Sequence, residues 1–260
     1  MPFAPSLATL NAWRACAEAA ARKAGAYALA RVRRRREVHR QFAHDIKIKL
    51  DRECQDMASA VIRGRFPGAA ILGEETPAPA AEPDPLWIID PIDGTVNFFH
   101  GLPFWCCSVA LQSAGRVVAG AVYAPKLDEC YTAHLRSPAT CNGKRIAVSA
   151  TARLSEAIVL TGLNKRPLAL ARSADRFRTL TLKTRKVRIL GSAALDLCQV
   201  AAGQADAYTE CGIYLWDAAA GSLIVERAGG RVDWLERKAN YEVRIAASNG
   251  RLQAPLRRLL

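Results

Sequence analysis

Acidic residues follow three apolar segments of this chain. Asp90 and Asp93 come after the run LWII, Glu74 and Glu75 follow AAILG, and Asp217 follows a Leu-Trp pair. Ligands bind at the carboxyl ends of strands in layered α/β folds, so we expect these carboxylates to meet at such an edge. Like charges gathered at one place repel each other unless a cation neutralises them. Carboxylates without neighbouring histidine or cysteine favour Mg²⁺, Mn²⁺ or Ca²⁺ over zinc.

The stretch from Asp90 to Thr95 combines possible cation ligands with a possible phosphate site. Pro91 stiffens the exit from the strand, and Gly94 permits a conformation or a close approach that a Cβ would block. Thr95 is predicted to open a helical turn, whose free N–H groups attract anions. Two simpler interpretations stay open, because Asp-x-x-Asp-Gly is also common in turns and Asp217 stands where it can cap a helix.

The composition describes a basic globular protein. The chain has 260 residues, 50% of them hydrophobic and 23% charged, which is enough for one large domain or two closely packed subdomains. The net charge of +13 attracts anions such as phosphate esters, nucleic acids or acidic membranes. The densest basic run, Arg31–Arg40, has three interpretations: the solvated end of a helix, steering of an anionic substrate, or nucleic-acid binding. No aromatic residues interleave with its arginines, which disfavours base stacking.

Cysteine spacing and hydropathy indicate the compartment. The eight cysteines form no CxxC pair and no zinc-like spacing, and several lie in apolar runs, so we expect buried free thiols. No apolar run approaches the ~20 residues of a membrane helix, and the N-terminus lacks a secretory pattern. We therefore expect a cytoplasmic protein with no membrane partner.

The periodicity of apolar residues changes near residue 148. Before this point we expect helices over 9–34 and 51–65 and buried strands over 69–73 and 86–90. We also expect a proline-rich exposed loop at 76–85 and hairpin turns at 113–115 and 142–143. Beyond it, strands and helices alternate. The sequence therefore predicts an α/β fold with subdomains 1–148 and 149–260 that together form one compact catalytic unit.

Four segments resemble the successive signatures of the inositol monophosphatase family: ILGEE, WIIDPIDGTVNF, GSAALDLCQVAAGQADAY and LWDAAAGSLIVERAGG. Their order and spacing also match, over most of the chain. The resemblance implies the αβαβα sandwich of the inositol monophosphatase and fructose-1,6-bisphosphatase fold. It also implies a homodimer and a Mg²⁺-dependent, lithium-sensitive phosphate monoesterase with two or three bound ions, for which Mn²⁺ is an alternative metal.

The resemblance assigns roles to individual residues. Glu74, Asp90, Asp217 and the Ile92 carbonyl would hold metal, and Asp93 would bridge to a second ion. Two ions about 4 Å apart can activate a water and stabilise the leaving oxygen, so phosphoryl transfer needs no covalent nucleophile. The catalytic set implied is Thr95, Asp51 and Glu74, and the substrate-binding set is Gly94, Thr95, Gly191, Ser192, Ala193 and Glu210.

The chain departs from the family pattern upstream of the two glutamates. The family places a Thr-Asp pair there, whereas this chain has Leu50 before Asp51. A contact between Asp51 and Thr95 remains possible, and the alternative for Asp51 is a helix cap. The family also tends to have a lysine further upstream, and Arg40 stands at about that distance, although we assign it no role.

The substrate is the least specified feature of the sequence. Glu210 stands where family members that hydrolyse inositol phosphate place an acid against a ring hydroxyl, and its alternative is a surface or interface role. Inositol-1-phosphate or a similar small polyol phosphate is the first hypothesis. The same chemistry on histidinol phosphate, fructose-1,6-bisphosphate, a 3′-phosphoadenosine nucleotide or NADP is the second. An RNA- or ribosome-associated regulatory protein is the third, and it would show steeply salt-dependent binding.

Overall fold

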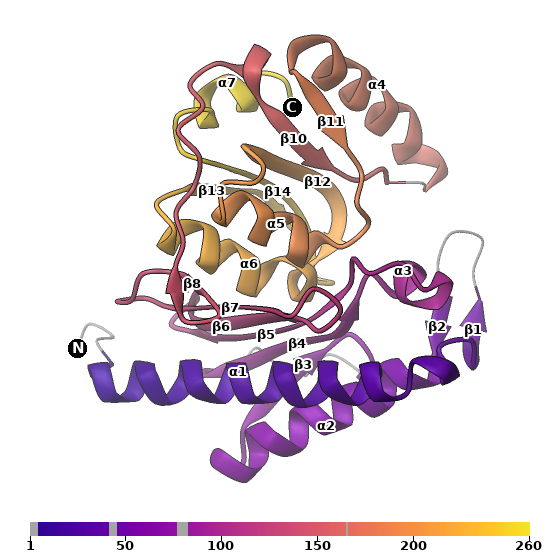
Figure 1. The fold of residues 1–260 in the computed structure, drawn as a ribbon, viewed down its shortest axis with the longest axis vertical. Helices are drawn as coiled ribbons and strands as arrows, with labels where there is room; N and C mark the ends of the chain where they lie inside the picture. Colours follow the sequence, from indigo (N-terminus) through magenta and orange to yellow (C-terminus); the bar gives the residue numbers. More distant parts are fainter. Residues whose placement is uncertain (1–4, 42–45, 77–82, 165) are drawn as a thin grey trace.

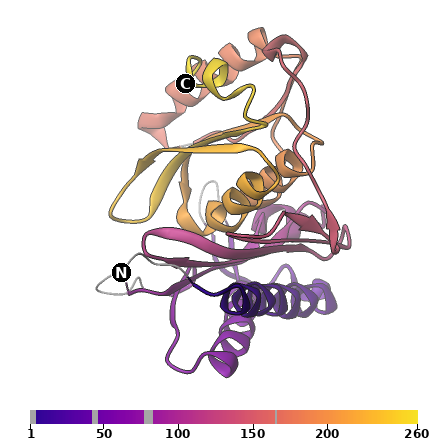
Figure 2. The same cartoon turned by 90° about the vertical axis from the view of Figure 1, so that its left-hand side faces the viewer.

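Five layers of helices and sheets alternate through the molecule. The computed structural model describes residues 5–41, 46–76, 83–164 and 166–260. Helices α1 (Leu7–Ala30) and α2 (Lys49–Arg65) cover one face of a seven-stranded sheet, and α5 (Ala193–Ala201) and α6 (Leu215–Arg227) cover the other face (Figure 1). A five-stranded sheet follows, with α4 and α7 outside it, and Figure 2 shows the same layers from the side. The predicted αβαβα sandwich is confirmed.

The seven-stranded sheet carries the first part of the chain. Its strand order is β3-β4-β5-β6-β7-β8-β9, with β3 parallel to β4 and the other neighbours antiparallel. The bounds are β3 (Ala70–Gly73), β4 (Leu86–Asp93), β5 (Cys106–Ser113), β6 (Arg116–Ala124), β7 (Glu129–His134), β8 (Thr140–Cys141) and β9 (Lys144–Arg145). Both predicted hairpins, β5–β6 and β8–β9, are present.

The five-stranded sheet carries the second part, in the order β11-β10-β12-β14-β13. Its strands are β10 (Ile158–Thr161), β11 (Lys186–Arg188), β12 (Ala207–Tyr214), β13 (Arg231–Arg237) and β14 (Glu242–Ser248). The remaining elements are α3 (Thr95–His100), α4 (Pro167–Lys183), α7 (Gln253–Arg257), a small hairpin of β1 (Val38–Gln41) and β2 (Ile46–Ile48), and two 3₁₀ turns at Val32–Arg34 and Leu154–Glu156. The division at 148/149 stays a prediction.

The central helices join the two sheets through one continuous apolar core. Leu197 of α5 and Leu223 of α6 are buried in the same cluster as Val122 of the first sheet and Tyr208 of the second. A second cluster lies between α1, α2 and the other face of the seven-stranded sheet, where Trp87 is buried. Burial of this apolar surface is the main favourable term in folding. The core therefore holds β4, β12 and α6 in a constant relative position.

The basic run differs from the expected helix end. Helix α1 stops at Ala30 rather than near residue 34, and a 3₁₀ turn follows. Arg34 binds both Glu37 and Glu53, with N–O distances of 2.9 and 2.8 Å. Arg31 lies over the ring of Tyr27, 3.6 Å from its centroid. The described part of the run thus folds back on its own acids and aromatic ring, so a purely solvated end is the wrong interpretation.

The remaining expectations concern thiols, membranes and loops. All eight cysteines are free, and all but Cys141 and Cys211 are buried, which confirms the predicted free thiols. Within the described residues, no helix is both long enough and apolar enough to cross a membrane. Most of the predicted proline-rich loop, residues 77–82, lies outside the described residues.

Candidate active site

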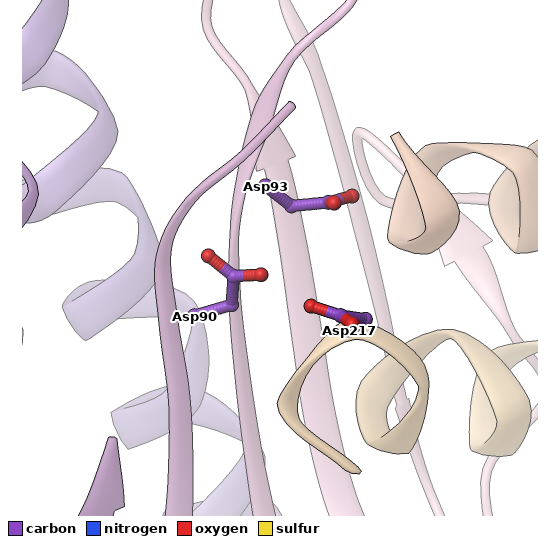
Figure 3. A group of neighbouring side chains, drawn as sticks. All are labelled: Asp90, Asp93 and Asp217. Atoms are coloured by element: carbon purple, nitrogen blue, oxygen red, sulfur yellow. The ribbon is translucent and has the colours of Figure 1, made fainter. Parts of the chain in front are cut away.

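Strand β4 brings two carboxylates to one end of the seven-stranded sheet. All eight of its residues are buried, which follows from its position between β3 and β5 beneath helices on both faces. The pairing with β5 shifts register between Asp90 and Asp93, and the Ile92 amide donates to Oδ1 of Asp90 at 3.1 Å. The strand thus continues three residues beyond its predicted end. Its irregular end presents both aspartates toward the central helices (Figure 3).

Asp217 completes the group from the middle layer. It is the third residue of α6, and its carboxylate accepts a hydrogen bond of 2.6 Å from the Tyr214 amide. The predicted cap is therefore present, but the helix begins two residues earlier than expected. Asp90, Asp93 and Asp217 each place one carboxylate oxygen within 4.8 Å of the others (Figure 3). Capping and facing the other acids are compatible, because a carboxylate has two oxygens.

Burial and mutual repulsion raise the pKa values of these carboxyls. The pKa of Asp90 is raised well above its ordinary value, first by burial and then by the charges of Glu74, Asp93 and Asp217. Burial raises the pKa of Asp217 in the same way, with further contributions from Asp93 and Glu74. An arrangement of hard oxygen donors that repel each other in a dry site fits a divalent cation. The donor set therefore suits the metal that the sequence implied.

The N-terminus of α5 holds Asp93 in place. The Ser192 hydroxyl and the Ala194 amide donate to Oδ2, the latter at 2.8 Å, while the Ala193 amide lies 3.3 Å from Oδ1. The Cys106 thiol is 3.7 Å from Oδ2. Burial raises the pKa of Asp93, and these donors oppose that rise without cancelling it. Two residues predicted to face substrate, Ser192 and Ala193, thus contact a predicted metal ligand.

Gly94 allows the turn after β4 to approach the α5 segment. Its φ is +86°, and a Cβ there would lie 3.1 Å from the carbonyl oxygens of Gly191 and Phe104. Helix α3 then begins at Thr95, as the sequence predicted. The Thr95 hydroxyl donates to the Ile92 carbonyl at 2.8 Å. Gly94, Thr95, Gly191 and the Ile92 carbonyl are therefore neighbours in the structure.

Asp51 lies in the first turn of α2 and is buried. Its Oδ2 accepts from the Ile48 amide at 2.8 Å, so the predicted helix cap is realised, with α2 starting at Lys49. Its Oδ1 has no hydrogen-bond partner among the described residues. Burial, followed by the charges of Glu74 and Glu75, raises the pKa of Asp51 well above its ordinary value. Such an orphaned buried oxygen is a candidate acceptor for a water or ligand proton.

Sequence reasoning missed a lysine beside the two glutamates. Lys47 of β2 places its Nζ against Oε1 of Glu74 and Oε1 of Glu75. The sequence signal that could have indicated it is a lysine between two isoleucines, in a short strand that is otherwise apolar. The arginine noted at sequence level, Arg40, pairs with Lys47 through the backbone of β1, and its side chain lies outside the described residues.

Glu210 lies in strand β12 of the five-stranded sheet. The Tyr208 hydroxyl donates to its Oε2 at 2.9 Å, and a Cβ on Gly162 would lie 1.8 Å from its Oε1. It lines a small pocket with residues of β10 and α4, including Arg176. Burial raises the pKa of Glu210 to about 7, and the hydrogen bond from Tyr208 opposes that rise. The charge of Asp93 also raises it, which connects Glu210 electrostatically to the carboxylate group.

Known proteins resemble this chain in both sequence and fold. The model of the inositol monophosphatase family matches residues 9–259. The chain belongs to the inositol monophosphatase family. Inositol monophosphatase 3 of Solanum lycopersicum is 35% identical over 244 residues, 90% of this chain and 91% of its own. A Thermotoga maritima protein named fructose-1,6-bisphosphatase/inositol-1-monophosphatase is 42% identical over 209 residues, 79% of this chain and 78% of its own.

Solved structures of the family agree with the fold. The extragenic suppressor protein suhB from Bartonella henselae superposes with a TM-score of 0.85 at 34% identity, covering 93% of this chain and 95% of its own. As an inositol monophosphatase family member, the protein is a phosphatase that hydrolyses phosphate monoesters. The acidic cluster of β4 and α6 is a group that could hold a divalent metal ion for this reaction.

Proposed function

We propose that the protein is a Mg²⁺-dependent phosphatase that hydrolyses inositol-1-phosphate or a similar small polyol phosphate to the polyol and inorganic phosphate. The observation that carries this proposal is the meeting of Asp90, Asp93 and Asp217 within 4.8 Å of one another, with the first two buried and Asp217 half-buried. Bound divalent ions supply the positive charge that phosphoryl transfer requires and activate the attacking water. Mn²⁺ has similar ligand preferences and is the expected substitute.

The chain's own residues hold the ions and orient the reactants. Asp90, Asp217, Glu74 and the Ile92 carbonyl form the proposed first ion site, and Asp93 extends it to a second ion. Because the Ile92 carbonyl accepts from Thr95, the Thr95 hydroxyl proton is already committed. Its oxygen lone pairs are therefore available to accept a hydrogen bond from the attacking water and so to orient it. The free Oδ1 of Asp51 is the second proposed acceptor on this side of the site.

The phosphate is held by backbone donors. The amides of Gly94 and Thr95, where α3 begins, are the proposed partners of its oxygens, because the first N–H groups of a helix have no partner within the helix. Ser192, Ala193 and Gly191 keep this turn in position through Asp93 and through the close approach to Gly94.

Substrate choice is proposed to rest on Glu210. Its carboxylate accepts one hydrogen bond from Tyr208, and its remaining lone pairs can accept hydrogen bonds from ring hydroxyls. The names of relatives, inositol monophosphatase in tomato and a dual fructose bisphosphate and inositol phosphate enzyme in Thermotoga, agree with a polyol substrate. They favour it over histidinol phosphate, a nucleotide or an RNA-associated role.

The test is phosphate release from a panel of phosphate esters. With Mg²⁺, we expect fastest turnover of inositol-1-phosphate and slower turnover of fructose-1,6-bisphosphate, histidinol phosphate, 3′-phosphoadenosine nucleotides and NADP. We also expect inhibition by lithium and no release with a chelator. Preference for a nucleotide would contradict the proposed substrate class. We further infer that the protein is a cytoplasmic homodimer. Size-exclusion chromatography with light scattering measures its molar mass and so tests the dimer.

A further inference from the structure

Strand β2 delivers a lysine to the outer side of the acidic cluster. The side chains of Lys47, Glu74 and Glu75 are 21%, 22% and 14% exposed, and the ammonium contacts one oxygen of each glutamate. An ion pair in such a partly buried position is screened much less than one on the surface. The charge of Lys47 therefore acts on the site and not only on the solvent.

The glutamates keep their places without help from the lysine. The Glu74 amide donates to the Ile89 carbonyl of β4 at 3.3 Å, next to Asp90. The Glu75 amide donates to Oε1 of Gln55 at 2.9 Å. Both backbone positions are thus attached to β4 and α2. Removing the ammonium would therefore change the charge between the two carboxylates while these backbone attachments remain.

Electrostatic effects connect this corner to the aspartates. The charge of Glu74 raises the pKa of both Asp90 and Asp217, so the three groups share one field. Lys47 acts in the opposite direction on its neighbour and lowers the pKa of Asp51. A cation bound by Glu74 and Asp90 would consequently lie close to the ammonium of Lys47, and like charges repel strongly in a partly dry site.

We propose that the Lys47 ammonium competes with a divalent ion for Glu74 and so weakens binding of that ion. This inference rests on the proposed function, because it takes Glu74 as a metal ligand. Without the ion, the ammonium neutralises part of the charge of Glu74 and Glu75. When the ion arrives, the ammonium keeps its contact with Glu75 and gives up Glu74. Lys47 thus acts as an exchangeable counter-ion that lowers the affinity of the site for the divalent ion.

Equilibrium binding of metal tests this proposal without relying on turnover. Free Mn²⁺ is followed by its paramagnetic resonance signal, and Mg²⁺ binding is followed by calorimetry. We expect Lys47→Met to bind the divalent ion held by Glu74 about tenfold more tightly than the wild type does. The substitution removes the competing charge and keeps a side chain of similar length. Lys47→Arg retains the charge and should stay within about threefold of the wild type. Lys49→Met removes an exposed lysine of the same segment and should change nothing.

Several outcomes would overturn the proposal. Unchanged or weaker binding by Lys47→Met would show that the ammonium does not compete. Equal tightening in Lys49→Met would assign the effect to net charge. If Lys47→Met is poorly stable without metal, the rise of its melting temperature on adding Mg²⁺ replaces calorimetry and must exceed that of the wild type. A wild type that binds neither Mg²⁺ nor Mn²⁺ contradicts the proposed function itself. Failure of the proposed function is thereby distinguished from failure of the proposed competition by Lys47.

Discussion

Glu210 shows how burial places a carboxyl in the physiological pH range. An ordinary glutamate is ionised well below neutrality, whereas the pKa of this one is raised to about 7. Above that value the carboxylate can accept hydrogen bonds at both oxygens, and below it one oxygen carries a proton. Ring hydroxyls of a polyol are donors, so the ionised form is the better partner. Substrate binding should therefore improve as the pH rises through 7.

Glu210→Gln tests this behaviour. We expect the KM of the wild type for inositol-1-phosphate to fall as the pH rises through about 7, after correction for ionisation of the substrate phosphate. In Glu210→Gln this inflection should vanish and KM should rise roughly tenfold, because an amide cannot ionise. Turnover of a generic phosphate ester should change little.

Tyr208→Phe is the matched variant, because it removes the donor that lowers the Glu210 pKa and should move the inflection upward. An inflection that persists unchanged in Glu210→Gln would contradict this role.

The predictability of the site depends on whether a residue's partners are close in sequence. Asp90 and Asp93 were recognisable because they end an apolar strand, and Asp217 because it follows a Leu-Trp pair at the start of a helix. Lys47 was not, since nothing in a short strand reveals that Glu74 lies opposite. The contact between Ser192 and Asp93 spans 99 positions. Such a contact depends on the packing of α5 against the first sheet, which periodicity does not report.

The short elements around the site illustrate how local rules operate. Each of the two site helices, α2 and α6, begins two residues earlier than its acidic residue suggested, because the carboxylate caps from the third position of the helix. The end of β4 continues to Asp93 because pairing with β5 resumes there after a register shift. The sequence predicted the types of these elements correctly. It missed their ends, where one tertiary hydrogen bond decides the boundary.

Gly94→Ala tests the turn between β4 and α3. A Cβ would meet two carbonyl oxygens at 3.1 Å, and the residue would have to keep a φ of +86°. We expect a loss of about 1–3 kcal/mol in the free energy of unfolding and a large loss of turnover. Urea denaturation and phosphate release measure the two effects.

Gly64→Ala is the control, because Gly64 is an exposed helical residue and a Cβ added there would meet no atom within 4 Å. That variant should be neutral or slightly more stable, since alanine favours helices. A Gly94→Ala protein as stable and active as the wild type would show that the close approach is not required.

At the scale of the whole molecule, the site is shared between layers. Asp90 and Asp93 come from the first sheet, Asp217 from a central helix, and Glu210 from the second sheet. The site therefore exists only in the folded protein, and an ion that binds there stabilises the fold by mass action. The layered fold itself was predictable from the resemblance, whereas the small β1–β2 hairpin was not, because its strands carry mixed and charged residues.

Thermal unfolding with and without Mg²⁺ tests this coupling. At about 100 times the dissociation constant, the ion should add about 2.7 kcal/mol to the free energy of unfolding, which corresponds to several degrees in melting temperature. Because the raised pKa values of Asp90 and Asp217 make protons compete with the ion, the increase should be larger at pH 8 than at pH 6. An increase that grows toward acidic pH would argue against these carboxylates as ligands.

The most direct test of the central claim compares phosphate release from inositol-1-phosphate by the wild type and by Asp93→Asn, with Mg²⁺ and with a chelator. We expect Mg²⁺-dependent release by the wild type. Release by Asp93→Asn should be at least a hundredfold slower, because a neutral amide binds Mg²⁺ poorly while the donors of α5 still hold the side chain. Release that survives the chelator, or near-normal turnover by a folded Asp93→Asn protein, would contradict the proposed metal-dependent mechanism.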